Sequence, residues 1–305
     1  MIPTPTPANW LSIIALGLIW GGTFMVVAIA LEGFGPVTVA AARTTLGAVS
    51  LVALVVATGR PWPGSGTGWY VIWGGLLSTA IPFTLLSWGQ QFVPSAFAGL
   101  SMAMVPLFVL PLAHLFTDER MTLRTTTGVS TGFVGALVLF GPGLGGGLAG
   151  WGFWGMLACV AAALCYAVSS VVTRRCPPVD PFSYAAMTLL VGAIPLVPAM
   201  LVIEGVPSAT GLRPELAILF LGLVPTALAA LLRVAVIRSA GPVFLTYVNY
   251  QVPLWSVFFG WLVLSENLPW RFFAALGLIL CGLLISQWPS LRRMAARSTG
   301  QPTAR

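Results

Sequence analysis

Residues 106–135 read PLFVLPLAHLFTDERMTLRTTTGVSTGFVG, and residues 253–282 read PLWSVFFGWLVLSENLPWRFFAALGLILCG. The two stretches align without a gap at a shift of 147 residues, which is the spacing from Pro106 to Pro253. The other matches at this shift are Gly75-Leu76 with Gly222-Leu223, Thr79-Ala80 with Thr226-Ala227, Leu107 with Leu254, Glu119 with Glu266, Arg124 with Arg271, and Gly135 with Gly282. Chance rarely aligns proline, glutamate and arginine together, so the chain contains two copies of one structural unit.

The composition places both copies in a membrane. Of 305 residues, 58% are hydrophobic and 7% are charged, and the mean hydropathy is +0.96. A soluble protein of this size could not present such a surface to water. Backbone groups in hydrocarbon must be satisfied within the segment, which favours helices, and the alternating pattern of a membrane barrel is absent. The sequence therefore predicts an all-α integral membrane protein.

Apolar runs bounded by proline, glycine and charge predict ten transmembrane helices. They cover residues 10–31, 36–57, 69–91, 95–117, 124–141, 151–174, 181–203, 214–238, 242–264 and 270–288. This divides the chain into a first five-helix repeat (1–141), a glycine-rich connection (142–150), a second repeat (151–288) and a cytoplasmic tail (289–305) that we expect to be disordered. Because five is odd, the second repeat starts on the opposite side of the membrane, so the repeats are inverted around a central cavity.

The arginines predict the orientation. All 14 basic residues are arginines, against seven acids. If the N-terminus is inside, ten arginines fall on the cytoplasmic side and only Arg213 and Arg271 on the outer side, with Arg43 and Arg233 inside spans. The positive-inside rule then predicts a multi-pass protein of the inner (plasma) membrane with both termini cytoplasmic. Arginines scattered singly or in pairs do not predict a nucleic-acid partner.

Several short motifs resemble a known family. They are Leu18-Ile19-Trp20-Gly21-Gly22 in the first span, the arginine of Ala41-Ala42-Arg43 in the second, and the repeat endings Pro106 to Glu119 and Pro253 to Glu266. With these motifs, residues 10–288 resemble the drug/metabolite transporter (DMT) superfamily, in its EamA-like branch of ten-span carriers. The resemblance implies a transmembrane transporter that exports or exchanges small polar metabolites, commonly amino acids or related compounds, by alternating access through a cavity between the halves.

A carrier must offer polar partners near the membrane midplane, so polar and aromatic stripes at helical spacing are candidates. The predicted substrate-binding residues are Arg43, Trp20, Trp88, Gln91, Tyr166, Thr246, Asn249 and Tyr250. The structural alternative is that such polar groups only bond across helices, at about 0.6 kcal/mol each. Trp20, next to Gly21 and Gly22, could likewise serve only close packing.

Arg43 is the strongest single candidate. It lies about seven residues into its span, where a charge is costly unless it faces protein or water. No intramembrane acid is available to pair with it. It either attracts a substrate carboxylate or caps carbonyl groups and holds helices together.

Four further residues are assigned to gating or structure. Pro106 and Pro253 each remove a backbone donor within a helix and predict kinks that would suit gating. Glu119 and Glu266 fall at helix ends and are predicted to organise the following turns with nearby arginines or backbone donors, rather than to couple protons.

An enzyme is not expected. One histidine, no paired intramembrane carboxylates, no metal-ligand spacing and no phosphate loop leave no catalytic cluster, no metal site and no cofactor site. The main alternative to a metabolite carrier is a lipid or polyprenyl-lipid flippase of the same fold. A laterally sealed cavity lined by Tyr250, Asn249 and Trp88 would favour the carrier. The expected partners are a small-molecule substrate and the bilayer, with the chain a monomer or homodimer.

Overall fold

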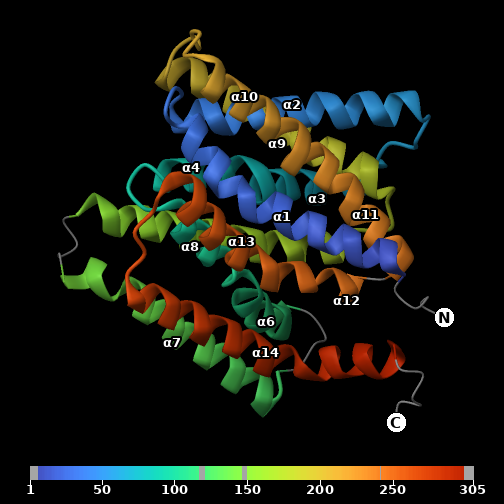
Figure 1. Ribbon diagram of the computed structural model, residues 1–305. Coiled ribbons are helices and arrows are strands. Elements are labelled where there is room, and N and C mark those ends of the chain that lie inside the picture. The colour runs from blue at the N-terminus through green and yellow to red at the C-terminus, as the bar shows by residue number, and fades with distance from the viewer. Residues whose placement is uncertain (1–5, 117–120, 146–149, 241, 299–305) are drawn as a thin grey trace.

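The computed structural model describes residues 6–116, 121–145, 150–240 and 242–298. Every regular element in these ranges is helical, which confirms the all-α prediction (Figure 1). Nine of the described helical segments are long and apolar enough to cross a membrane. The remaining predicted span, 242–264, consists of α12 (Pro242–Leu245) and α13 (Tyr247–Leu264), and α13 begins with polar residues that include Asn249 and Gln251.

The two halves have the same order of spans. In the first half they are α1 (Pro7–Ala30), α2 (Pro36–Ala57), then η1 (Ser65–Thr67), α3 (Gly68–Gly75), η2 (Leu76–Ala80) and α4 (Ile81–Gly89) as one span, α5 (Ser95–Met102) with α6 (Val105–Phe116), and α7 (Leu123–Gly145). In the second half they are α8 (Trp151–Arg175), α9 (Pro181–Ile203), then α10 (Leu212–Leu221), η3 (Gly222–Leu228) and α11 (Ala229–Ala240) as one span, α12 with α13, and α14 (Trp270–Ser298).

Two boundaries differ from the prediction. The tail expected to be disordered from residue 289 is helical as far as Ser298, because α14 continues past the predicted end of its span. Helix α7 likewise runs on to Gly145, into the connection predicted at 142–150. In both places the helix continues beyond the end of the apolar run. The hydrophobic pattern predicts only the part of a helix that lies in the hydrocarbon, so it does not predict where the helix ends.

Helices α2 and α9 show directly that the halves are inverted. Glu204, which follows α9, accepts hydrogen bonds from the backbone N–H groups of Val37 (2.9 Å) and Thr38 (2.8 Å) at the start of α2. At the other end of the pair, Arg60, which follows α2, forms a 3.0 Å ion pair with Asp180 at the start of α9. Equivalent helices of the two halves therefore run antiparallel.

The fifth and tenth spans repeat this arrangement. Arg124 near the start of α7 donates from Nε to the Ile285 carbonyl near the end of the α14 span, at 3.2 Å. Small residues bring the two helices together: a Cβ added to Gly128 would lie 2.6 Å from the Gly282 carbonyl oxygen. Helices α7 and α14 lie side by side, apart from most of the bundle (Figure 1).

The third and eighth spans each contain a π-helical turn, η2 and η3, at matching places in the repeat. Thr79 in η2 and Thr226 in η3, which the 147-residue shift pairs, both return their hydroxyls to backbone carbonyls of their own helix. Each threonine also faces a glycine of the opposite half: Thr79 faces Gly192 of α9, and Thr226 faces Gly47 of α2. The two halves thus interlock through equivalent residues.

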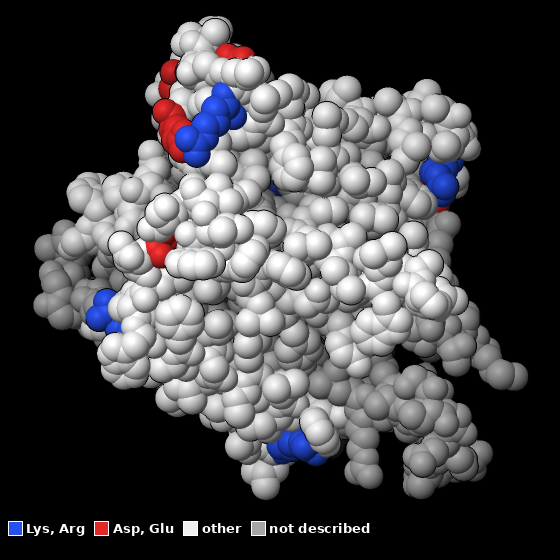
Figure 2. All heavy atoms as spheres, in the orientation of Figure 1, with Lys and Arg blue, Asp and Glu red and all other residues white. Residues whose placement is uncertain are grey.

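The first and ninth spans pack closely through glycine. A Cβ on Gly17 would lie 2.9 Å from Cβ of Gln251, and one on Gly21 would collide with Trp255. A largely buried apolar cluster then fills the space between α1, α5, α8 and α13. Around this core the face drawn in Figure 2 is almost entirely uncharged, with acidic and basic atoms gathered at its margins. That distribution is typical of a surface in contact with lipid.

The two predicted proline kinks differ in the structure. The fourth span is interrupted between Met102 and Val105, immediately before Pro106. Helix α13 contains Pro253 and continues through it, and the interruption in the ninth span comes earlier, between Leu245 and Tyr247. A role of either proline in gating stays a prediction.

Candidate functional site

The guanidinium of Arg43 lies buried where the two halves meet. The residue is only 4% exposed. The guanidinium lies over the ring of Phe83 in α4, 3.8 Å from the ring centroid. Nη2 donates to the hydroxyl of Thr226 in η3 at 3.4 Å, and Nε is buried with no hydrogen-bond partner among the described residues. A side chain with five donors therefore makes one long hydrogen bond and one ring contact.

The groups around Arg43 come from both halves. Phe83 belongs to the first half, while Thr226 and Tyr166 belong to the second; Tyr166, on α8, lies near the Arg43 guanidinium. None of the salt bridges between described residues involves Arg43. A cation held away from water without an opposite charge is costly, and a ring face compensates by only about 0.5–2 kcal/mol. The site is therefore suited to an anionic group.

Trp20 of α1 contacts η3, the π-helical turn that contains Thr226. Its indole Nε1 donates to the carbonyl oxygen of Pro225 at 3.3 Å. A proline inside a helix cannot donate its own backbone hydrogen bond, and η3 contains Pro225. Two of the predicted residues, Trp20 and Arg43, therefore both bond to η3.

Further unsatisfied polar atoms follow Phe83 along α4 and at its C-cap. Phe83, Ser87 and Gln90 follow one another at helical spacing and share one face. Within the described part of the chain, Oγ of Ser87 and Oε1 of Gln90 are buried and have no hydrogen-bond partner. Buried polar atoms without partners are uncommon in proteins and mark places where water or a ligand can bind.

The other predicted substrate-binding residues lie elsewhere. Trp88 makes edge-on contacts with Phe92 and Trp151, with ring centroids 5.0 and 6.4 Å away. Gln91 is exposed at the end of α4. The Tyr250 hydroxyl donates to the carbonyl of Leu283 in α14 at 3.3 Å, so this side chain joins α13 to α14.

The two remaining candidates lie near the start of the ninth span. Thr246 occupies the interruption between α12 and α13, and Asn249 is half-buried in the first turn of α13. Among the described residues Asn249 forms no side-chain hydrogen bond with Arg43. Their assignment to substrate binding stays a prediction.

Glu266 caps a helix of the opposite half. Its carboxylate accepts hydrogen bonds from the backbone N–H groups of Ser95 (2.6 Å) and Ala96 (3.1 Å) at the start of α5. Glu204, at the end of α9, binds the N-terminus of α2 in the same way. Two carboxylates of the second half therefore bind helix N-termini of the first half. The sequence predicted that Glu266 organises the turn that follows it, whereas the backbone donors to its carboxylate belong to the start of α5. Glu119, its equivalent in the first half, lies outside the described residues.

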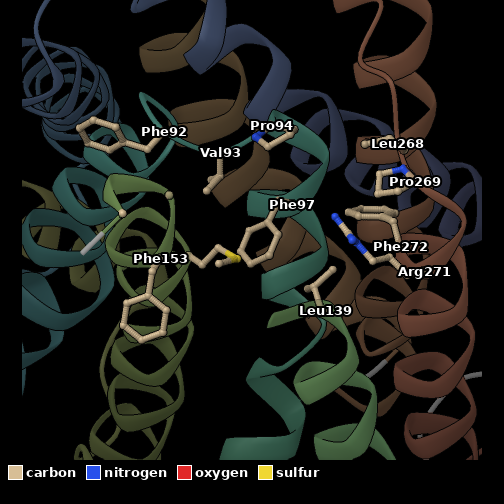
Figure 3. Close-up of a pocket in the computed structure, with 13 residues that line it drawn as sticks. Phe92, Val93, Pro94, Phe97, Leu139, Phe153, Leu268, Pro269, Arg271 and Phe272 are labelled. Carbon is tan, nitrogen blue, oxygen red and sulfur yellow. The ribbon is translucent and has the colours of Figure 1, made fainter. Parts of the chain in front are cut away.

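Two cavities open near the end of the molecule that carries Glu266. One, of about 380 Å³, has the lining Phe92, Val93, Pro94, Phe97, Leu139, Gly150, Gly152, Phe153, Met156, Leu268, Pro269, Arg271 and Phe272 (Figure 3). The other, of about 500 Å³, has the lining Leu254, Val257, Phe258, Trp261, Glu266, Asn267, Leu268 and Phe273. Neither is the cavity lined by Tyr250, Asn249 and Trp88 that the sequence led us to look for.

Phe83 and Thr226 are the site residues that the sequence analysis missed. A signal for Thr226 was present, because the repeat alignment matches it with Thr79. That match identifies the repeat but does not by itself indicate a binding role. Phe83 gave no signal, since one phenylalanine in an apolar span is indistinguishable from a packing residue.

Comparison with known proteins agrees with this architecture. The profile of the EamA-like transporter family matches twice, at residues 9–141 and 153–288, once in each half. Among the relatives, "Uncharacterized inner membrane transporter YedA" of Escherichia coli K12 is 27% identical over 276 residues, covering 90% of this chain and 89% of that protein. The "Probable terminal-alkyne amino-acid exporter" of Streptantibioticus cattleyicolor is 26% identical over 235 residues, covering 74% of this chain and 77% of that protein. A solved structure that is 21% identical has a TM-score of 0.65 over 93% of this chain and 99% of its own, which shows a shared fold.

Two inverted five-helix halves around a buried polar site define a membrane transporter of the inverted-repeat class. More specifically, the chain belongs to the EamA-like transporter family, within the drug/metabolite transporters that its sequence resembles. This family and the names of the relatives indicate a transporter rather than an enzyme.

Proposed function

We propose that this protein carries a small polar metabolite with a carboxylate group, such as an amino acid, and that Arg43 binds the carboxylate. The observation that carries the proposal is the buried Arg43 guanidinium, which lies between groups of both halves with Nε unpartnered. A carboxylate would supply the missing opposite charge through paired N–H···O bonds. The printed name of the Streptantibioticus cattleyicolor relative, an amino-acid exporter, supports the same substrate class.

The remaining groups of the site suit the rest of such a solute. Tyr166 and Trp20 offer aromatic faces, and the buried Ser87 and Gln90 on α4 offer a hydroxyl and an amide oxygen without partners. An amide oxygen accepts hydrogen bonds from an ammonium group; because Gln90 follows Phe83 by seven residues, about 10 Å along the helix, that group would lie at the end of the solute away from the carboxylate. This complementarity favours an amino acid over a sugar phosphate, which would need several cations.

Transport is proposed to proceed by alternating access between the halves, as export or exchange, in the inner membrane with both termini cytoplasmic. Each half contributes to the Arg43 site, so relative movement of the halves can expose it to one side at a time. The first and last described helices begin and end at the same end of the molecule (Figure 1), and the arginine distribution assigns that end to the cytoplasm. The name of the Escherichia coli relative supports the inner membrane.

The test is binding and uptake in proteoliposomes with a panel of labelled amino acids, amines and sugars, with and without an imposed pH gradient. In Arg43→Gln the affinity for the best substrate should fall by about 10- to 150-fold, the worth of hydrogen bonds between charged groups. Arg43→Lys should retain part of the affinity. The methyl ester of the substrate should bind wild type as weakly as the acid binds Arg43→Gln.

Arg213→Gln is the matched control, since Arg213 lies on the surface and pairs with Glu32 at 3.3 Å. It should transport like wild type. Unchanged affinity in Arg43→Gln would show that the carboxylate binds elsewhere. Transbilayer movement of labelled phospholipid by wild type, without uptake of any metabolite, would favour the flippase alternative.

A further inference from the structure

The symmetry of α7 and α14 is broken at one arginine. Arg124 near the start of α7 binds the Ile285 carbonyl of α14. The repeat alignment pairs Arg124 with Arg271 near the start of α14, and pairs Ile285 with Val138 of α7. A symmetric helix pair would have Arg271 bound to the Val138 carbonyl. No such bond is present between the described residues, and Arg271 makes no ion pair with any of them.

The side chain of Arg271 points instead into the cavity of about 380 Å³ between α5, α7, α8 and α14 (Figure 3). The cavity walls are apolar: Phe97, Leu139, Met156 and Phe272 line it, and each is less than a tenth exposed. Its volume is at the lower end of the range for ligand sites, roughly 300–1,000 Å³. A single cation at the edge of an apolar chamber is complementary to an amphiphile with an anionic head.

The position of the cavity identifies the kind of amphiphile. Trp270 and Trp151, both strongly exposed, lie beside the cavity at the same end of the molecule. Exposed tryptophans at helix ends mark the level of the lipid headgroups. Phe92 and Trp151 stack at one side of the opening, with ring centroids 5.5 Å apart. An apolar cavity that starts at headgroup level is filled most directly from the adjoining leaflet.

We infer that this cavity is a phospholipid site, in which one acyl chain lies against Phe97 and Met156 and the lipid phosphate binds Arg271. The site is separate from Arg43, and the lipid is a bound component and not the transported solute. The lipid fills the space between the α7/α14 pair and the rest of the bundle. The lipid phosphate also gives Arg271 a hydrogen-bond acceptor, as the Ile285 carbonyl of α14 does for Arg124.

The glycine at position 152 offers a direct way to fill the cavity. A Cβ there would meet no atom closer than 4.0 Å, the Phe92 carbonyl oxygen. Gly152→Leu therefore places a side chain in the acyl-chain space while improving the helix propensity of the α8 start. Gly68→Leu is its matched control, because Gly68 begins α3 and an added Cβ there also meets open space.

The experiment is native mass spectrometry of the full chain in detergent, titrated with phosphatidylglycerol. Wild type, Gly68→Leu, Arg213→Gln and Arg43→Gln should each retain one lipid with similar affinity. Gly152→Leu should lose this binding. Arg271→Gln should weaken it by about tenfold or more, since a hydrogen bond to a charged group is lost.

Inorganic phosphate at millimolar concentration should not displace the lipid, and a single-chain lysophospholipid should compete. Wild-type retention in Gly152→Leu or Arg271→Gln would overturn the inference. Displacement by inorganic phosphate alone would also overturn it, because the site would then bind a free anion. Loss of the lipid in Arg43→Gln would place it in the transport site instead.

Discussion

The contact between Gly47 and Thr226 gives a quantitative test of how the halves interlock. In Gly47→Ala, the new Cβ would lie 2.5 Å from Cγ2 of Thr226. Carbon atoms at rest are about 3.5–4.0 Å apart, so α2 and η3 must separate by about an ångström. Overpacking of this kind costs about 1–3 kcal/mol of unfolding free energy. Because Thr226 also accepts the hydrogen bond of Arg43, substrate affinity should fall in the same variant.

A double-mutant cycle identifies the responsible atom. Thr226→Ser removes Cγ2 and keeps the hydroxyl, and the next nearest atom to the new Cβ is then Cβ of residue 226, at 3.2 Å. The serine alone should cost about 0.8 kcal/mol for one buried methyl group. The double variant should be more stable than the sum of the two changes by about 1–2 kcal/mol.

The assay is reversible unfolding in mixed detergent micelles, with substrate binding measured on the same samples. Gly277→Ala is the control, because an added Cβ at that helical glycine meets nothing within 4 Å. It should stabilise the protein by about 0.5–1 kcal/mol through helix propensity. If Gly47→Ala and Gly277→Ala changed the unfolding free energy equally, or if the two changes in the cycle were strictly additive, the contact between Gly47 and Thr226 would not be what joins the halves.

Three further predictions use the same unfolding assay. Glu266→Gln should cost about 1 kcal/mol, because the N-terminus of α5 loses a charged cap; no change in stability would mean that water replaces the carboxylate without loss. At Asp180, partial burial opposes ionisation, but hydrogen bonds from the start of α9 and from Arg60, with the charge of Arg60, outweigh it and lower the pKa. The stability it contributes should be present at neutral pH and be lost as the pH falls below the ordinary carboxyl value of 3.8, and Asp180→Asn should remove that part of the pH dependence; an unchanged profile would contradict the assignment. Trp20→Phe should cost about 0.6 kcal/mol through loss of the bond to Pro225, and a neutral result would show that the indole serves packing alone.

The sequence was sufficient to predict the fold because membrane spans and inverted repeats leave strong one-dimensional signals. Apolar runs gave the order of all ten spans, and the 147-residue match gave the two halves. Helix ends were less predictable: hydropathy gives no signal for the stretch of α14 beyond the membrane, up to Ser298.

The candidate site was only partly predictable, for a physical reason. A buried cation such as Arg43 stands out in an apolar span whatever surrounds it. A tyrosine or asparagine at helical spacing shows only that it lies on a given face of its helix. The sequence predicted that Tyr250 would face the substrate cavity. In the structure this face of α13 packs against α14, and the Tyr250 hydroxyl donates to the Leu283 carbonyl. Which neighbour a face meets depends on the packing of both halves, which the hydrophobic pattern does not record.

The two carboxylate caps determine what must be broken when one end of the transporter opens. Glu204 and Glu266 both belong to the second half, and both hold helix starts of the first half at the same end of the molecule. Parting the halves there would expose four amide donors that water must then solvate. At the opposite end the halves are joined mainly through side chains: Arg60 pairs with Asp180, Arg124 donates to the Ile285 carbonyl, and Tyr184 donates to the Tyr70 carbonyl. Opening the end that carries Glu204 and Glu266 therefore requires water or bound solute to replace four backbone hydrogen bonds to carboxylates.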